Sequence, residues 1–96
     1  SAQAHHGGPG FRCSTAKHAA EIVVCSSSKL SRLDRRLNYW YGRAKERARY
    51  FDQTGWLRSQ QRAWIRSRNA CYWNKRCINR KYRQRIRELR RYFTHV

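Results

Sequence analysis

The sequence is poor in acids, in aliphatic side chains and in residues that break helices. Its 96 residues contain five Asp and Glu against 23 Lys and Arg, a formal net charge of +18, with one Pro and no Met. A membrane span needs about 20 consecutive apolar residues, whereas the longest aliphatic run is Ile22 to Val24. A disordered basic tail would lack aromatic residues, which make up 14% of this chain. We therefore expect one small folded domain without a membrane span.

The few aliphatic residues predict a thin core that needs covalent support. With five Leu, four Ile and three Val, aromatic residues and Ala must supply much of the buried area. Repulsion among the uncompensated charges further destabilises so small a domain. Four cysteines are available for disulfides, and they are Cys13, Cys25, Cys71 and Cys77.

The cysteine spacing favours disulfides over zinc binding or free thiols. Structural zinc usually takes ligands two to four residues apart within each pair. Here eleven residues separate the first two cysteines and five separate the last two. We expect no metal and no cofactor. Disulfides predict an oxidising compartment, either periplasmic or secreted, and since no apolar leader is visible we expect a mature form whose signal peptide has been removed.

Apolar residues recur with helical spacing from Phe11 onward. The Gly-rich residues 1–10 are predicted to be a disordered arm, and residues 11–96 a single helical domain. The periodic stretches predict helices over residues 18–25, 30–51, 56–71 and 78–93. Short connections favour antiparallel neighbours. The predicted fold is therefore all-α, a small disulfide-stabilised bundle of one short and three longer helices around an antiparallel hairpin core.

The hairpin geometry predicts a structural ion pair. If the second and third helices are antiparallel, facing residues have numbers that sum to about 104, which places Asp34 near Arg68 and Tyr41 near Gln61. An exposed Asp34 among neighbouring arginines would contribute about 0.5 kcal/mol to stability. Because Asp34 borders the apolar stripe of its helix, we favour a partly buried, bidentate pair with Arg68 that fixes the helix register.

Four blocks of the sequence, in chain order, carry a resemblance to a known family. They are Phe11-Arg12-Cys13 with Glu21 to Cys25; Leu30, Leu33-Asp34, Leu37 and Tyr41; Gln61 to Ile65 with Arg68 and Cys71; and Cys77-Ile78, Tyr82, Arg85-Ile86 and Leu89. Together they resemble the LprI-like domains, small exported bacterial modules named after a lysozyme inhibitor. Tyr41, Gln61, Trp64 and Tyr82 are the family-motif residues that we single out. The sequence departs from the pattern at Arg12, where an acid is common, and at Ser26 to Ser28, where Asp-Pro is frequent.

The resemblance implies a helical, disulfide-linked domain in the periplasm or outside the cell, with a lysozyme-like hydrolase as a candidate partner. Four cysteines allow three pairings. We favour Cys13 with Cys25 and Cys71 with Cys77, because an extended stretch after Cys13 can return along the short helix and the second pair flanks a single turn. The two crossed pairings remain open at this point.

The basic residues point to a noncovalent partner of negative charge. Eighteen of them are Arg, whose planar guanidinium grips phosphate or carboxylate through two hydrogen bonds. Our main functional prediction is an exported, strongly basic protein that binds an anionic envelope or extracellular partner, namely lipopolysaccharide, acidic glycan, anionic lipid or nucleic acid. Nonspecific, salt-sensitive binding to nucleic acid is expected in vitro. The predicted contact residues are Arg32, Arg35, Arg36, Arg66, Arg76, Arg80, Arg83 and Arg87.

Two alternatives are ranked below polyanion binding, and catalysis is ranked lowest. The first alternative is inhibition of lysozyme or a related cell-envelope hydrolase, placed second because animal lysozymes are basic and would repel this chain. The second is a purely structural envelope protein. We expect no enzymatic activity and no catalytic residues, because the five acids are dispersed, glycine-rich phosphate loops are absent and the cysteines are expected to be oxidised.

Overall fold

The structure is a computed structural model that describes residues 8–94. The 3₁₀ turn η1 (Cys13–Thr15) is followed by the helices α2 (Ala19–Ser26), α3 (Ser28–Tyr50), α4 (Thr54–Asn69) and α5 (Lys75–Thr94). No strand occurs in this part of the chain, so the predicted all-α class, with one short and three longer helices, is confirmed. None of the described helices is both long enough and apolar enough to cross a membrane.

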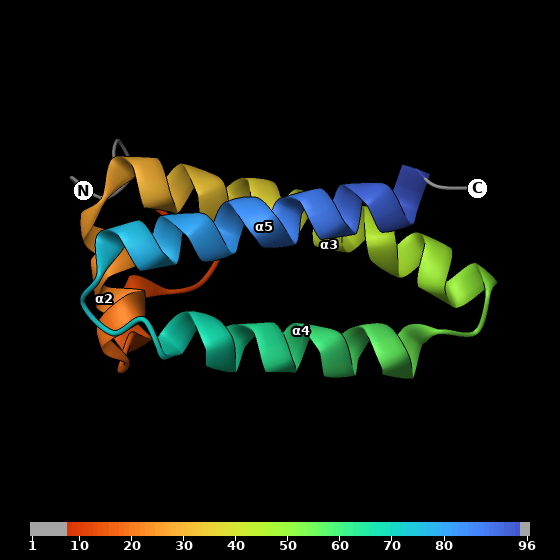
Figure 1. Cartoon of the computed structure of the whole chain (residues 1–96), viewed down its shortest axis with the longest axis horizontal. Coiled ribbons are helices and arrows are strands. Elements are labelled where there is room, and N and C mark those ends of the chain that lie inside the picture. Colours follow the sequence, from red (N-terminus) through yellow and green to blue (C-terminus); the bar gives the residue numbers. More distant parts are fainter. Residues whose placement is uncertain (1–7, 95–96) are drawn as a thin grey trace.

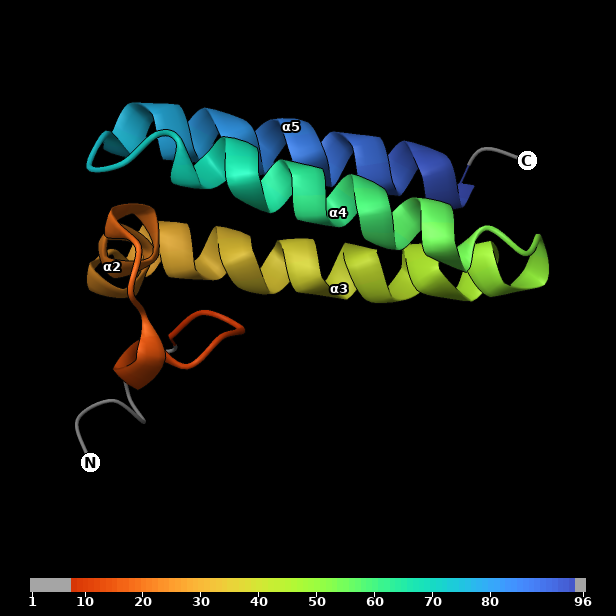
Figure 2. The ribbon, with the colours of Figure 1, turned by 90° about the horizontal axis from the view of Figure 1, so that it is seen from below.

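The three long helices lie along the longest axis of the molecule, and the short α2 lies across one end of them (Figure 1). Successive long helices are antiparallel, as predicted, so α5 returns to run parallel to α3. These two helices lie side by side and form the most extensive helix contact, while α4 packs against both (Figure 2). The N-terminal ends of α3 and α5 are therefore close to α2, at the same end of the bundle.

Side chains and turns define the ends of the helices. The Ser27 hydroxyl, one of three consecutive serines, accepts a hydrogen bond from the Leu30 amide at 3.2 Å and caps α3. The turn after α3 needs a left-handed residue, and Asp52 supplies it with φ 56°. Asn74 accepts from the Cys77 amide at 3.0 Å and caps α5.

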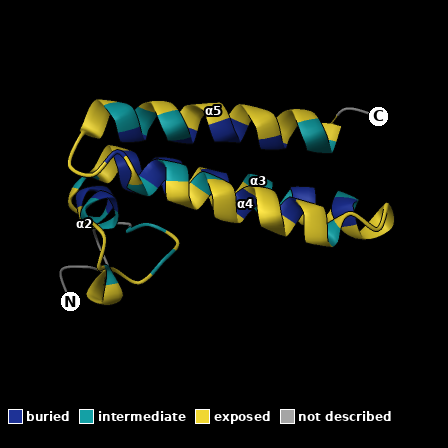
Figure 3. Cartoon of the chain, turned by 60° about the horizontal axis from the view of Figure 1, so that its bottom comes forward, coloured by how far each residue is buried: buried dark blue, intermediate teal, exposed yellow. Residues whose placement is uncertain are grey.

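The core runs between α3 and α5 and includes Leu57 of α4, and α2 covers it at one end. The buried faces of the helices point inward (Figure 3). Ala44 and Ala48 are fully buried on α3, where small side chains allow close helix packing. Tyr82 is the largest fully buried side chain, so one aromatic residue does fill the centre, as the shortage of aliphatic residues predicts.

The predicted apolar stripes are too wide at the α3–α4 end. Phe51 and Trp56 were expected on the buried seams, but each is 51% exposed, and Ile65 is 37% exposed. The reason is that α4 buries a narrow face, which consists of Leu57, Gln61 and Arg68.

Candidate functional site

A buried chain of polar groups links three helices at the centre of the bundle. The Tyr82 hydroxyl of α5 donates to Asp34 Oδ1 of α3 at 2.7 Å and accepts from Arg68 Nη1 of α4 at 3.1 Å. Asp34 and Arg68 are each 4% exposed, and Tyr82 is fully buried. Burial, reinforced by the negative charge of Asp34, raises the pKa of Tyr82 well above its ordinary value, so the phenol remains a donor.

The predicted bidentate pair between Asp34 and Arg68 is wrong in its direct form. The antiparallel register does bring the two side chains to the same level, but α5 inserts the Tyr82 hydroxyl between them. The ion pair that Arg68 forms is with Glu21 Oε2 of α2, at 3.8 Å. The expectation failed because it considered two helices, whereas the site is built by four.

Glu21 connects the short helix to this network. Its Oε1 accepts from the amides of Lys17 and His18 at 3.0 and 3.2 Å, which secures the start of α2. Partial burial of the Glu21 carboxyl acts to raise its pKa, but the two amide donors and the Arg68 guanidinium outweigh burial and hold the pKa below its usual value. Glu21 is therefore held as a carboxylate beside Arg68.

The second oxygen of Asp34 holds the segment that precedes η1. Asp34 Oδ2 accepts from the Gly10 amide at 2.7 Å and from Asn38 Nδ2 at 3.3 Å. A Cβ on Gly10 would overlap the Asn38 amide group, so any larger residue here would have to displace the Asn38 side chain. Arg35 Nη1 also donates to the Gly8 carbonyl at 2.6 Å. Residues 8–10 of the expected arm thus contact α3, and residues 1–7 lie outside the described residues.

A second buried cation, which the sequence analysis did not single out as a site residue, lies between α4 and α5. Arg85 is 6% exposed and donates to Gln61 Oε1 at 3.0 Å and to Glu88 Oε1 at 3.1 Å. Its Nη2 has no hydrogen-bond partner among the described residues. Only its position in the sequence indicated that Arg85 is buried, because Arg85 is three residues after Tyr82 and four before Leu89, on the apolar face of its helix.

The family-motif residues mostly join α4 to α5. Gln61 binds Arg85, and Trp64 Nε1 donates to the Lys81 carbonyl at 3.1 Å while its ring packs edge-on against Tyr82. Tyr41 is half-buried, with the Lys45 ammonium 5.2 Å from its ring centre. The motif therefore has a structural explanation in this protein.

A cavity of about 210 Å³ lies beside the buried network. Its lining includes Phe11, Glu21, Asp34, Trp64 and Arg68. The polar groups in this lining already hydrogen-bond to one another or to backbone, and no group of three His, Cys, Asp or Glu side chains suited to a metal is found in residues 8–94. This arrangement fixes the relative positions of four helices, and it offers no pairing of nucleophile and base.

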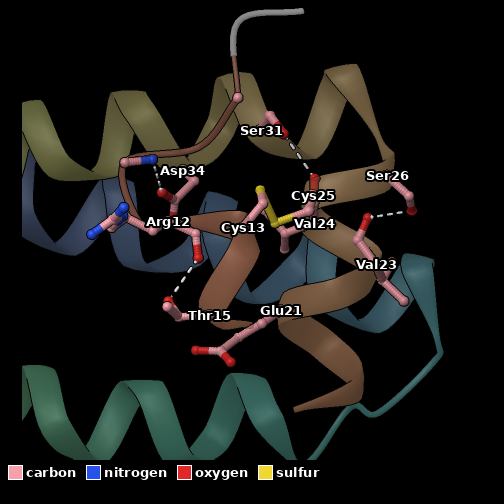
Figure 4. The surroundings of a disulfide bond; sticks show 12 residues. Arg12, Cys13, Thr15, Glu21, Val23, Val24, Cys25, Ser26, Ser31 and Asp34 are labelled. Atoms are coloured by element: carbon pink, nitrogen blue, oxygen red, sulfur yellow. Dashed lines mark hydrogen bonds between the residues drawn. A yellow bond between two sulfur atoms is a disulfide. The ribbon is translucent and has the colours of Figure 1, made fainter. Parts of the chain in front are cut away.

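Two disulfides reinforce the same end of the bundle. Cys13 is bonded to Cys25, with a Cα–Cα distance of 5.8 Å, and joins η1 to α2 (Figure 4). Cys71 is bonded to Cys77, with a Cα–Cα distance of 5.6 Å, and closes the connection between α4 and α5. The favoured pairing is confirmed.

All eight arginines predicted to bind anions are exposed, but they do not converge on one pocket. Arg76, Arg80, Arg83 and Arg87 share one face of α5 by their helical spacing. Arg32, Arg35 and Arg36 lie on α3, and Arg66 lies on α4. Of the eight, only Arg76 lines a described groove of about 350 Å³, which it shares with Lys29 and Lys75 at the shared N-terminal end of α3 and α5.

The connection between α4 and α5 exposes two aromatic side chains, which are not among the predicted site residues. Tyr72 is 66% exposed and Trp73 is 65% exposed. Both lie inside the ring closed by the Cys71–Cys77 disulfide. They are close in sequence to the basic groove just described, because Lys75 and Arg76 follow them in the chain after one intervening residue, Asn74.

Comparison with known proteins identifies the family. No curated protein and no solved structure matches the chain significantly. The family model described as Lysozyme inhibitor LprI matches residues 12–89, which include both disulfides, the buried polar network and most of α5. This match covers well over half of the chain. The protein therefore belongs to the family of the lysozyme inhibitor LprI.

Proposed function

We propose that this protein inhibits a lysozyme-type cell-wall hydrolase by binding it noncovalently. The observation that carries the proposal is the match of the lysozyme inhibitor LprI family to residues 12–89. The buried polar groups also support the proposal, because Asp34, Tyr82 and Arg68 are linked by hydrogen bonds that hold the helices in a fixed scaffold. A scaffold that is rigid before binding loses little conformational entropy on association.

The two disulfides support a site of action outside the cytoplasm. Disulfides persist in oxidising compartments such as the periplasm and the cell exterior. Hydrolases that cleave cell-wall polysaccharides meet their substrate in those compartments. We therefore propose a periplasmic or secreted location for the inhibitor.

The net charge restricts the class of hydrolase that this inhibitor would bind. A protein of +18 is repelled by a basic lysozyme and attracted by an acidic one, over distances set by the ionic strength. Electrostatic attraction mainly raises the association rate. We propose that the target is a lysozyme-type hydrolase with an acidic surface.

A lysis assay tests this function. The oxidised protein is added to a panel of basic and acidic lysozyme-type hydrolases, and the clearing of a cell-wall suspension is followed at 50 and 200 mM salt. We expect inhibition of at least one acidic enzyme and a defined complex in calorimetry. Absence of both inhibition and heat across the acidic members would refute the proposal. The protein with reduced and alkylated cysteines is the matched control.

A second candidate function is binding of an anionic polymer, which the four arginines exposed along one face of α5 favour. Heparin, lipopolysaccharide and DNA are titrated at the same two salt concentrations, with the fluorescence of the four Trp as the signal. Polymer binding predicts that affinity falls by roughly a factor of 10³ or more over this range if about six or more phosphates are contacted. A specific protein complex is expected to survive the change.

A further inference from the structure

We propose that the disulfide-closed segment Cys71–Cys77 is the part of this protein that enters the substrate cleft of the inhibited hydrolase. This inference rests on the proposed function and names the surface and the part of the partner that it fits. It is argued from the rigidity of the segment, its exposed aromatic residues and its charge.

Several interactions fix the conformation of this segment. The Cys71–Cys77 disulfide closes it, and the amide of Asn74 donates to the Cys71 carbonyl at 3.1 Å. The backbone amide of Tyr72 donates to the backbone carbonyl of Asn69 at 3.1 Å. Tyr72 itself has a φ of 52°, which is unfavourable for a residue with a Cβ. A loop held in a single shape presents its side chains without a large entropic cost on binding.

The exposed aromatic residues of the segment have no role in the core. Tyr72 and Trp73 are each about two-thirds exposed, in a chain that is short of apolar residues for its own interior. Neither ring takes part in the aromatic or cation–π contacts of the described residues. Trp and Tyr are the residues that most often dominate the binding energy of protein interfaces.

A second group of exposed aromatic residues, at the opposite end of the bundle, provides a contrast, and the exposed Tyr39 packs against Trp40. At that opposite end Tyr50 and Phe51 contact each other, Trp56 contacts Tyr92, and Arg47 lies over the Phe51 ring. These side chains therefore have partners within the molecule. Tyr72 and Trp73 form the unpartnered aromatic pair of the described surface.

The charge next to the aromatic pair does not serve the stability of α5. Lys75 and Arg76 are in its first turn, where acidic side chains are favourable and cations are not, and the turn contains no acid. Together with Lys29 they line the groove of about 350 Å³. This arrangement places two cations and two exposed aromatic residues within the same disulfide-closed segment.

The catalytic cleft of a lysozyme-type hydrolase is complementary to this combination. Such enzymes cleave between sugar rings with a pair of carboxyl groups placed on either side of the scissile bond. Aromatic side chains of the inhibitor would occupy the space of sugar rings, and Lys75 and Arg76 would lie toward the carboxylates. A projecting, rigid segment fits a concave cleft, so inhibition is expected to be competitive with substrate.

The test uses the full oxidised protein and an acidic hydrolase that it inhibits in the panel. In the variant Tyr72→Ser/Trp73→Ser we expect the inhibition constant to rise at least about 30-fold, as for loss of an interface hot spot. In Lys75→Gln/Arg76→Gln we expect an association rate that is lower by about 5- to 10-fold at low salt. The matched controls are Tyr50→Ser, which removes an aromatic residue that is 84% exposed at the far end, and Arg58→Gln/Arg62→Gln, which removes two exposed charges from α4. Both controls are expected to change the inhibition constant by less than about twofold.

Two further measurements make the result decisive. Circular dichroism and thermal unfolding establish that each variant is folded, and a soluble oligosaccharide substrate establishes whether inhibition is competitive. Unchanged inhibition by folded Tyr72→Ser/Trp73→Ser, or noncompetitive inhibition by the wild-type protein, overturns this inference and leaves the proposed function standing. If the wild-type protein inhibits none of the enzymes, the proposed function fails and the inference fails with it.

Discussion

The Tyr82 hydroxyl lies between Asp34 and Arg68, at 2.7 Å from the carboxylate oxygen and 3.1 Å from the guanidinium nitrogen. It thereby connects α3, α4 and α5 through groups that are almost completely buried. A hydrogen bond to a buried charged group contributes more to stability than one between neutral groups. The first predictions concern this arrangement.

Replacement of Tyr82 by Phe removes the shared hydroxyl and keeps the ring. We expect the free energy of unfolding to fall by about 2 to 3 kcal/mol, because Asp34, which is almost completely buried, loses a hydrogen-bond donor. Urea denaturation of the oxidised protein measures the change. The matched control is Tyr39→Phe, since Tyr39 is 59% exposed, and an equal effect in both variants would contradict the network.

Replacement of Arg68 by Leu leaves two carboxylates without their cation. Glu21 loses its ion pair, and Asp34 loses the positive charge beyond Tyr82, so we expect a loss of about 3 to 5 kcal/mol. Adding Asp34→Leu should restore part of that loss, because one uncompensated buried charge is then removed. Simple additivity of the two single variants in a double-mutant cycle would show that the residues are not coupled.

Acid should weaken the protein through Glu21. Because the folded-state pKa of Glu21 lies below its usual value of 4.5, its contribution to stability is present above that pH and is lost as the pH falls through the folded pKa. We expect the stability difference between wild type and Glu21→Gln to shrink as the pH is lowered from 6 to 3. A difference that is constant over this range would rule out the proposed role of the carboxylate.

Alkali should also weaken the protein, through Tyr82. The folded state raises the pKa of this phenol above its ordinary value of 10.0, so the folded protein binds more protons than the unfolded chain above that pH. Stability should therefore fall as the pH rises beyond 10, and Tyr82→Phe should remove this part of the decline. Unfolding curves at pH 9 and 11 provide the measurement, and identical slopes for the two proteins would count against it.

Removal of each disulfide should have a measurable and unequal effect. Replacing Cys13 and Cys25 by Ala opens the longer loop, with a sequence separation of 12, and should cost about 3 kcal/mol. Replacing Cys71 and Cys77 opens a loop with a separation of 6 and should cost about 2 kcal/mol. Denaturation in the absence of reductant measures both. If neither pair changed stability, the thin core would be sufficient without covalent support.

Helical periodicity and cysteine spacing were enough to predict the fold class and the disulfides. The stripe that contains Leu30, Leu33 and Leu37 predicted α3, and the short distances between cysteines predicted their pairing. The hairpin register also placed Asp34 and Arg68 at the same level. Each of these inferences depends on local spacing, which the sequence contains directly.

Inferences that depend on three or more helices could not be made in the same way. The position of Tyr82 between Asp34 and Arg68 requires α5 to lie parallel to α3, and the pair of Arg68 with Glu21 requires α2 to cross the end of the bundle. Arg85 is buried because Gln61 and Glu88 accept its hydrogen bonds, yet an arginine in such a basic chain is expected to be exposed. The sequence also gives no sign that the ring of Trp73 has no aromatic or cationic partner among residues 8–94, which only the structure shows.

Four of the five acidic side chains of this protein are buried or held beside a neighbouring arginine or tyrosine, and the fifth, Asp52, is exposed in the turn after α3. Asp34, Glu21 and Glu88 meet Tyr82, Arg68 and Arg85, and Glu46 lies 3.8 Å from Arg43. The outward field is consequently almost uniformly positive. Two such molecules that approach each other at low ionic strength repel each other, so a higher protein concentration should not favour self-association.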